Sequence, residues 1–246
     1  MIVGSLFSGC GGTALGFQRA GYEHAWFVEN NDYAAATIRK NFPGATVYGD
    51  IKEVDFTTVR GVDVLEGGFP CQDISNAGRR AGIEGSRSSL WKHFARAISE
   101  LRPRFVCIEN VAALTRRGLD VVLIDLAALG YAAEWHCVSA SAVGAPHRRD
   151  RIFILAYSDC VGQLHGQTTE LSAKPVEPSQ FKSGGSGSAS LTPGWWSVEP
   201  DVGRVAHGVP DRVDRIKCLG NAVVPQNAEV IARAIKEISR GVNYLE

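Results

Sequence analysis

The chain has 246 residues, 45% of them hydrophobic, and its 26 basic and 26 acidic side chains give a formal net charge of zero. This suits one α/β domain with a full core, and the neutral average gives no sign of a nucleic-acid-binding protein. No apolar run approaches the ~20 residues that a membrane-spanning helix needs, and the N-terminus lacks the basic leader of a signal peptide.

Charge is unevenly distributed along the chain. Acidic residues outnumber basic ones in 1–70, whereas basic residues predominate in 79–104. Such a segment can form a local surface that holds phosphates, or simply a solvated helix face.

The six cysteines stand at positions 10, 71, 107, 137, 160 and 218, and none forms a CxxC pair. This spacing predicts reduced thiols in a cytoplasmic protein without structural zinc. Cys107 and Cys137 each lie inside a strand pattern, so we expect both to be buried as small hydrophobic side chains.

Apolar runs alternate with helical patterns through the first 156 residues. Strands are predicted at 2–7, 24–29, from Val47, and at 62–66, 104–108, 133–138 and 151–156. Helices are predicted after the glycine cluster that ends at Gly12, at 32–41, 88–101 and 119–129, and from Pro225. This alternation predicts a mostly parallel sheet with helices on both faces.

The regular pattern stops after the last of these strands. Residues 158–194 show weak periodicity and contain the tract SGGSGSAS at 183–190, which predicts a flexible linker or loop tip.

A glycine-rich turn follows the first predicted strand. Residues 9–14 fit G-x-G-x-x-A, and Glu29 ends the second strand about twenty residues later. Glycines let a ligand approach the backbone, and the carboxylate can bind both hydroxyls of a ribose. A lone glycine motif is more often a plain turn, but Asp50, at the end of the third strand, adds a second carboxylate at the same edge. Together they predict a site for an adenosine-containing cofactor.

Cys71 is the candidate nucleophile. It follows Gly67, Gly68 and Pro70 just after the fourth strand, so we expect it on an exposed turn beside the cofactor site. Glu109 ends the fifth strand, and Arg148, Arg149 and Arg151 precede the strand at 151–156. The arginines offer fixed donors near the same edge, or else form an ordinary surface cluster.

These segments together resemble the DNA (cytosine-5) methyltransferase family, with the greatest likeness to its short phage- or prophage-type members. The matching pieces are LFSGCGG (6–12), VEN (28–30), GDI (49–51), GGFPCQDIS (67–75), ENV (109–111), PHRRDRIF (146–153) and LGNAVVPQ (219–226).

The resemblance implies a Rossmann-like class I methyltransferase fold that binds S-adenosyl-L-methionine and methylates carbon 5 of a cytosine flipped out of double-stranded DNA. It also implies a monomer without a metal. The catalytic domain would comprise 1–157 plus 216–246, with the final helix packed beside the first strand. Residues 158–215 would form a much reduced target-recognition region.

The resemblance assigns roles residue by residue. The catalytic residues would be Cys71, Glu109, Arg149 and Arg151. The cofactor would contact Phe7, Gly9, Cys10, Gly11, Gly12, Glu29, Asn30, Asp50, Ile51, Pro70, Leu90, Asn221 and Ala222. DNA would contact Gln72, Ser75, Arg79, Arg87, Arg204 and Arg212.

Two features depart from the family pattern. His147 stands where many members have Gln, and the region between the arginine motif and GNAVVP is short. Because base readout needs several side chains in a groove, we expect a short or loosely read target.

Three other functions stay open on the sequence. They are methylation of transfer RNA, a non-catalytic DNA-binding role, and a dinucleotide-dependent dehydrogenase. The dehydrogenase leaves Pro70-Cys71 and Glu109-Asn110-Val111 unexplained.

Overall fold

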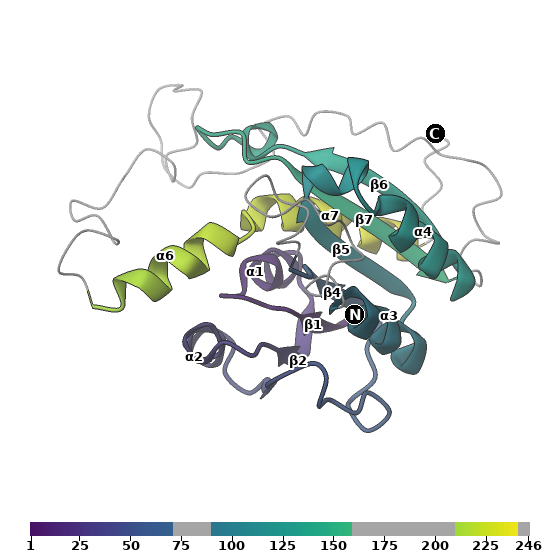
Figure 1. Ribbon diagram of the computed structural model, residues 1–246, viewed down its shortest axis with the longest axis horizontal. Helices are drawn as coiled ribbons and strands as arrows, with labels where there is room; N and C mark the ends of the chain where they lie inside the picture. The colour runs from purple at the N-terminus through teal and green to yellow at the C-terminus, as the bar shows by residue number, and fades with distance from the viewer. Residues whose placement is uncertain (71–89, 159–209, 241–246) are drawn as a thin grey trace.

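A seven-stranded sheet forms the centre of the protein, in the order β3-β2-β1-β4-β5-β7-β6 (Figure 1). The computed structural model describes residues 1–70, 90–158 and 210–240. The strands are β1 (Ile2–Leu6), β2 (Glu23–Val28), β3 (Thr46–Tyr48), β4 (Val64–Gly67), β5 (Phe105–Val111), β6 (Tyr131–Val138) and β7 (Arg151–Ser158). The first five pair in parallel, and β7 lies antiparallel between β5 and β6. The predicted mostly parallel sheet is confirmed.

Helices cover both faces of this sheet, as the sequence predicted. They are α1 (Gly12–Arg19), α2 (Asp32–Asn41), α3 (Leu90–Leu101), α4 (Leu119–Ala128) and α7 (Pro225–Ser239). The described residues also form helix α6 (Arg212–Asn221) and the short 3-10 turns η2 (Ala112–Arg116) and η3 (Ala140–Val143). Helix α2 begins where predicted because the Asn31 side chain accepts a hydrogen bond from the Ala34 amide, 3.0 Å away.

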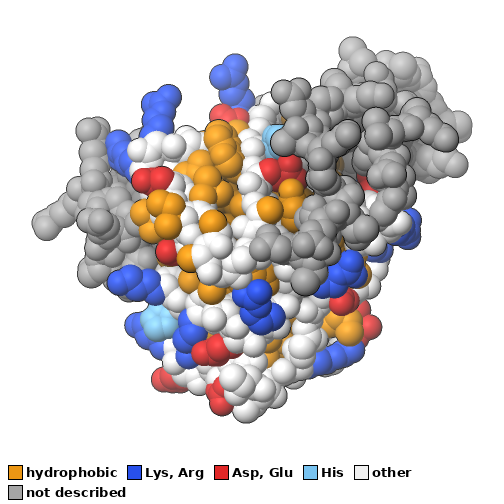
Figure 2. Space-filling view, turned by 90° about the vertical axis from the view of Figure 1, so that its right-hand side faces the viewer, with side chains coloured by type: hydrophobic (Ala, Val, Ile, Leu, Met, Phe, Trp, Pro, Cys, Tyr) orange, Lys and Arg blue, Asp and Glu red, His pale blue; other side chains and the backbone are white. Residues whose placement is uncertain are grey.

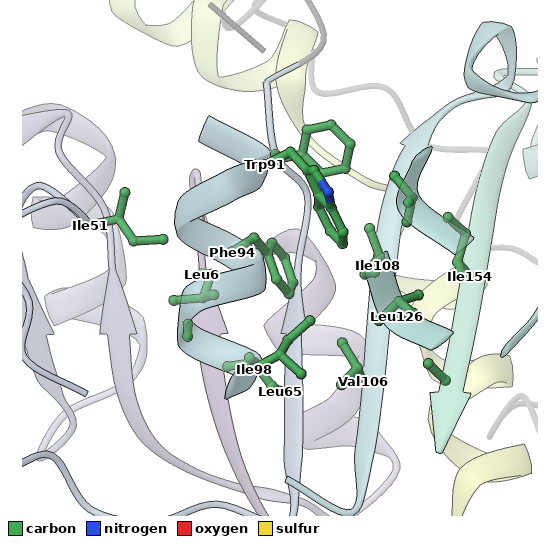
Figure 3. Packing of buried hydrophobic residues seen from close by; sticks show 14 of the residues in the cluster. Leu6, Ile51, Leu65, Trp91, Phe94, Ile98, Val106, Ile108, Leu126 and Ile154 are labelled. Carbon is green, nitrogen blue, oxygen red and sulfur yellow. The ribbon is translucent and has the colours of Figure 1, made fainter. Parts of the chain in front are cut away.

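The largest core cluster joins α3 and α4 to one face of the sheet. Trp91, Phe94 and Ile98 point from α3 toward Leu65 and Val106 (Figure 3). Each fully buried side chain of this size contributes about 1.5–3 kcal/mol to folding. This packing fixes α3, whose first residue reaches the site described below.

The opposite face is covered by α1 and α7, from the two ends of the chain. Val3 of β1 shares a buried cluster with Ala232 and Ile235 of α7. The Tyr22 hydroxyl donates to the Ala232 carbonyl over 2.8 Å. At Gly16 an added Cβ would lie 2.4 Å from the Pro225 carbonyl oxygen, so only glycine permits this close helix contact. The final helix therefore does return to the first strand.

One burial prediction was wrong. Cys107 is 1% exposed in the central strand β5, as expected, but Cys137 on β6 is exposed. Strand β6 lies at one edge of the sheet, and an edge strand is only partly covered. Trp135 on the same strand is likewise 43% exposed. The four cysteines within the described ranges are free.

Helix α6 was not predicted, and it crosses the domain boundary expected at 215/216. Figure 1 shows it extending away from the sheet. Among the described residues, no helix is long and apolar enough to cross a membrane, and no group of His, Cys, Asp or Glu has the arrangement of a metal site.

Candidate active site

The carboxyl ends of the central parallel strands open into a cavity of about 660 Å³. Small-molecule sites commonly occupy ~300–1,000 Å³, and in open α/β sheets they lie at this edge. Predicted site residues that line the cavity are Phe7, Gly9, Cys10, Gly12, Glu29, Asn30, Pro70, Leu90, Glu109, Arg151, Asn221 and Ala222. The fold thus brings the predicted cofactor and catalytic residues into one space.

At one end of the cavity, Glu29 braces the glycine turn. Its Oε2 accepts from the Gly9 amide at 2.7 Å, and its Oε1 accepts from the Asn31 amide at 2.8 Å. Gly9 and Gly11 have φ of 54° and 85°, in the left-handed region that favours glycine. Each carboxylate oxygen has a second lone pair, so Glu29 is held rigidly and can still accept from a ligand hydroxyl.

Aromatic and aliphatic side chains form a wall beside this turn. Phe7 is half-buried, and the centroid of its ring lies 6.3 Å from that of Phe94, with the two ring planes inclined by 27°. Leu90, at the start of α3, lines the same cavity. Such a surface suits the flat face of a nucleobase.

A second wall comes from the last residues of α6 and the short segment that joins it to α7. Gly220, Asn221, Ala222 and Val223 all line the cavity. A Cβ added at Gly12 would lie 2.6 Å from the Val223 carbonyl oxygen, so the segment rests directly on the glycine turn. Residues more than 200 positions apart in the chain thereby enclose one end of the cavity.

Glu109 occupies the other end. Its side chain is 11% exposed, and the Arg151 Nε lies 2.8 Å from its Oε1. Burial raises the pKa of Glu109 to about 7, although the charges of Arg151 and Arg149 oppose this rise. The carboxyl is therefore poised to be protonated or ionised near neutral pH, as an acid–base group needs to be.

The backbone leading to position 71 packs against this carboxyl. A Cβ added at Gly68 would lie 2.7 Å from the Glu109 Oε2. The Asn110 Nδ2 donates to the Phe69 carbonyl over 3.1 Å, and this contact is buried. Asn110 therefore fixes the chain two residues before Cys71.

Several predicted residues fall outside the described ranges. These are Cys71, Gln72, Ser75, Arg79, Arg87 and Arg204. Arg212 is described, and it begins α6. The roles predicted for all of them stay predictions.

Four of the described residues that were predicted to bind the cofactor or to act in catalysis do not line the main cavity. Gly11 caps the start of α1. Asp50 borders a separate cavity of about 380 Å³, and its Oδ1 accepts from the Lys52 amide at 3.0 Å. The Ile51 side chain is 3% exposed and belongs to the α3 core cluster (Figure 3). Arg149 donates its hydrogen bonds to the carbonyls of Gly220 and Ala222, so it contacts the second wall of the cavity.

Other cavity residues received no role from the sequence. Lys52 lines the cavity beside the GDI motif, and Lys217 and Cys218 reach it from α6. Asn110 could have been found, because it follows Glu109 within a polar stretch that ends a buried strand. The two α6 residues had no such signal, because the helix itself was missed.

Charge on the surface is mixed. Figure 2 shows hydrophobic side chains gathered on one face, with basic and acidic side chains interspersed around them.

The sheet order, with a glycine turn facing a strand-end carboxylate, is that of a Rossmann-like α/β protein. The family model described as C-5 cytosine-specific DNA methylase matches residues 1–183, and the chain belongs to this family.

The chain is similar to curated type II methyltransferases from bacteria. M.PspPI of Psychrobacter sp. (strain TA137) is 41% identical over 157 residues, covering 61% of this chain and 38% of that protein. M.NgoFVII of Neisseria gonorrhoeae is 33% identical over 184 residues, covering 70% of this chain and 49% of that protein. The match therefore spans half or less of each relative.

A solved structure shares the same fold. It is a protein assigned as a DNA modification methyltransferase and encoded within an Escherichia coli prophage. The two superpose with a TM-score of 0.56 at 31% identity, over 65% of this chain and 47% of the other.

Proposed function

We propose that this protein is a DNA (cytosine-5-)-methyltransferase that acts on a cytosine flipped out of duplex DNA, through a covalent adduct with Cys71. The observation that carries the proposal is the single cavity that joins the Glu29-braced glycine turn to buried Glu109 and to Pro70, the residue before Cys71. Family membership supports the same chemistry.

The residues at the glycine-turn end fit S-adenosyl-L-methionine. Glu29 can accept from both ribose hydroxyls, and Phe7 with Leu90 offers an apolar wall for adenine. Asn221 and Ala222 line the same cavity, and they are proposed to enclose the methionine end. When bound, this cofactor supplies an electrophilic methyl group on a sulfonium sulfur.

Carbon 5 of cytosine is a poor nucleophile, and Cys71 is the residue that activates it. The thiolate forms a bond to carbon 6, which breaks the aromaticity of the ring and moves electron density onto carbon 5. After carbon 5 is methylated, a base removes its proton and the sulfur–carbon 6 bond breaks, restoring the double bond. A free thiol has a pKa of ~8.5, so binding must promote loss of the Cys71 proton.

Glu109 is the group that recognises cytosine in this proposal. In its protonated form it donates to ring nitrogen 3 and accepts from the exocyclic amine, which selects cytosine over thymine. Its raised pKa supports this role, because a large fraction of the carboxyl is then protonated at neutral pH. Arg151 orients the carboxyl and can donate to the carbonyl oxygen of the base.

DNA contacts are proposed for six basic and polar residues. They are Gln72, Ser75, Arg79, Arg87, Arg204 and Arg212. Flipping a base costs a few kcal/mol, and phosphate contacts offset part of this cost. The protein is proposed to act as a monomer, with 158–215 as a small recognition region.

A transfer assay tests the proposal directly. The protein and its Cys71→Ala variant are incubated with S-adenosylmethionine labelled in the methyl group and mixed-sequence duplex DNA, and the product is sequenced for 5-methylcytosine. We expect label in DNA that depends on Cys71, and the sequencing then reveals the target motif.

The other outcomes separate the alternative functions. Label in transfer RNA but not in DNA would move the substrate to RNA and keep the mechanism. Cofactor binding without transfer to either would indicate a non-catalytic relative. Covalent trapping on 5-fluorocytosine DNA checks the thiolate step by itself, and it must disappear in Cys71→Ala.

A further inference from the structure

Arg149 adopts an unusual backbone conformation directly before β7. Its φ is 39°, in the left-handed region that side-chain-bearing residues rarely adopt. Residues held in such conformations cluster at functional sites, where surrounding contacts enforce them. The hydrogen bonds of the Arg149 side chain indicate its role in the structure.

The guanidinium of Arg149 binds the end of α6. Its Nη2 donates to the Gly220 carbonyl over 2.7 Å, and its Nε donates to the Ala222 carbonyl over 3.1 Å. The last carbonyls of a helix have no partner within the helix and carry partial negative charge. Arg149 therefore places a positive charge at the C-terminal end of α6, where it binds the carbonyls of the residues before and after Asn221.

The backbone around Arg149 is itself fixed. The Arg148 carbonyl accepts from the Ala140 amide at 2.6 Å and from the Ser139 hydroxyl at 2.8 Å. Two residues after Arg149, Arg151 enters the sheet and pairs with Val111 of β5. Because the backbone is fixed on both sides of Arg149 in the sequence, the position of its guanidinium is restricted as well.

Arg149 and Arg151 form their hydrogen bonds with different parts of the cavity lining. Arg151 contacts Glu109, whereas Arg149 contacts the Gly220–Ala222 wall. The next residue, Val223, rests on Gly12, so this segment is held between the glycine turn and Arg149.

We propose that Arg149 is a positioning residue for cofactor binding, which holds the Gly220–Ala222 wall in place while Arg151 alone orients Glu109. This inference rests on the proposed function, because it takes the ligand of that wall to be S-adenosylmethionine. It revises the expectation, drawn from the family resemblance, that Arg149 is a catalytic residue.

The test measures binding of S-adenosylhomocysteine by calorimetry, without DNA, and then steady-state kinetics on DNA. Arg149→Gln should weaken binding and raise the cofactor KM about tenfold, with kcat at saturating cofactor within about threefold of wild type. The cofactor affinity of Arg149→Lys should lie between those of Arg149→Gln and wild type, because an ammonium group keeps the charge but not the two-pronged set of donors of the guanidinium. Arg148→Gln, which removes the same charge from the exposed neighbouring residue, should match wild type.

Arg151→Gln should have the opposite effect, which is a lowered kcat with unchanged cofactor affinity. Hydrogen exchange adds a direct readout, since amides at 220–224 should lose protection in Arg149→Gln only.

Two results would overturn the inference. One is a dissociation constant for Arg149→Gln within about twofold of wild type, and the other is a loss of kcat without a change in cofactor affinity. If Arg149→Gln does not fold, an unchanged constant in Arg149→Lys overturns it equally. Wild-type protein that binds no S-adenosylhomocysteine would instead refute the proposed function, so the two failures are distinguishable.

Discussion

Replacing Glu109 by Gln should remove about 2 kcal/mol of the pH dependence of the free energy of unfolding between pH 5 and pH 7. Burial raises the pKa of this carboxyl from its ordinary value of 4.5 to about 7 in the folded protein. Between these values the folded state holds a proton that the unfolded chain has lost. The contribution to stability is therefore complete below about pH 4.5 and is lost as the pH rises through about 7.

The magnitude follows from the two pKa values. A difference between 4.5 and about 7 corresponds to a full loss of about 3 kcal/mol at high pH. At pH 5 about 1 kcal/mol of that loss is already present, which leaves about 2 kcal/mol between pH 5 and pH 7. Glu109 is 8% exposed, so solvent screening reduces this value little. Gln has a similar shape and does not ionise, so it removes only the titration.

Urea unfolding at pH 5, 6 and 7 gives the measurement. The stability of wild type should fall by about 2 kcal/mol more than that of Glu109→Gln across this range. Glu53→Gln removes a carboxyl from an exposed position and should run parallel to wild type. Parallel curves for wild type and Glu109→Gln would refute the reasoning, because the buried carboxyl would then ionise as it does in water.

Three further substitutions test the site. Gly68→Ala should lower kcat about 10- to 100-fold while cofactor affinity stays unchanged in calorimetry, because its Cβ would displace the Glu109 carboxyl. Asn110→Ala should destabilise the protein by about 1–2 kcal/mol in urea unfolding and also lower the rate of methyl transfer, since the Phe69 carbonyl loses its buried donor. An unchanged rate would contradict the positioning role of Asn110. Glu29→Gln should weaken S-adenosylhomocysteine binding at least about tenfold, because one carboxylate oxygen that accepts from a backbone amide becomes a donor. Wild-type affinity in that variant would count against the ribose role.

The sequence determined the elements whose signals are local. The α2 range matches the prediction at 32–41 because an Asn cap and a helical apolar pattern lie within one short segment. The start of α7 at Pro225 follows from the preference of proline for the first turn of a helix. The apolar run of β5 ends at residue 108, but the strand continues through the polar pair Glu109-Asn110 to Val111.

The sequence also predicted much of the candidate site, because its residues occur directly after predicted strands. Parallel strands end at one edge of a sheet, so Phe7, Glu29, Pro70 and Glu109 could be expected to meet there, and they line one cavity. Local pattern could not show that the Ile51 side chain points into the core, because that depends on how α3 packs against the sheet.

The remaining features depended on partners distant in the chain. The antiparallel insertion of β7 between β5 and β6 is a pairing of strands, and no apolar pattern within a strand specifies its neighbours. The burial of Cys107 and the exposure of Cys137 follow from central and edge positions in that sheet. The hydrogen bonds of Arg149 reach carbonyls more than seventy residues away. Local side-chain periodicity determined which segments became strands and helices, and only long-range packing decided which of their side chains face each other.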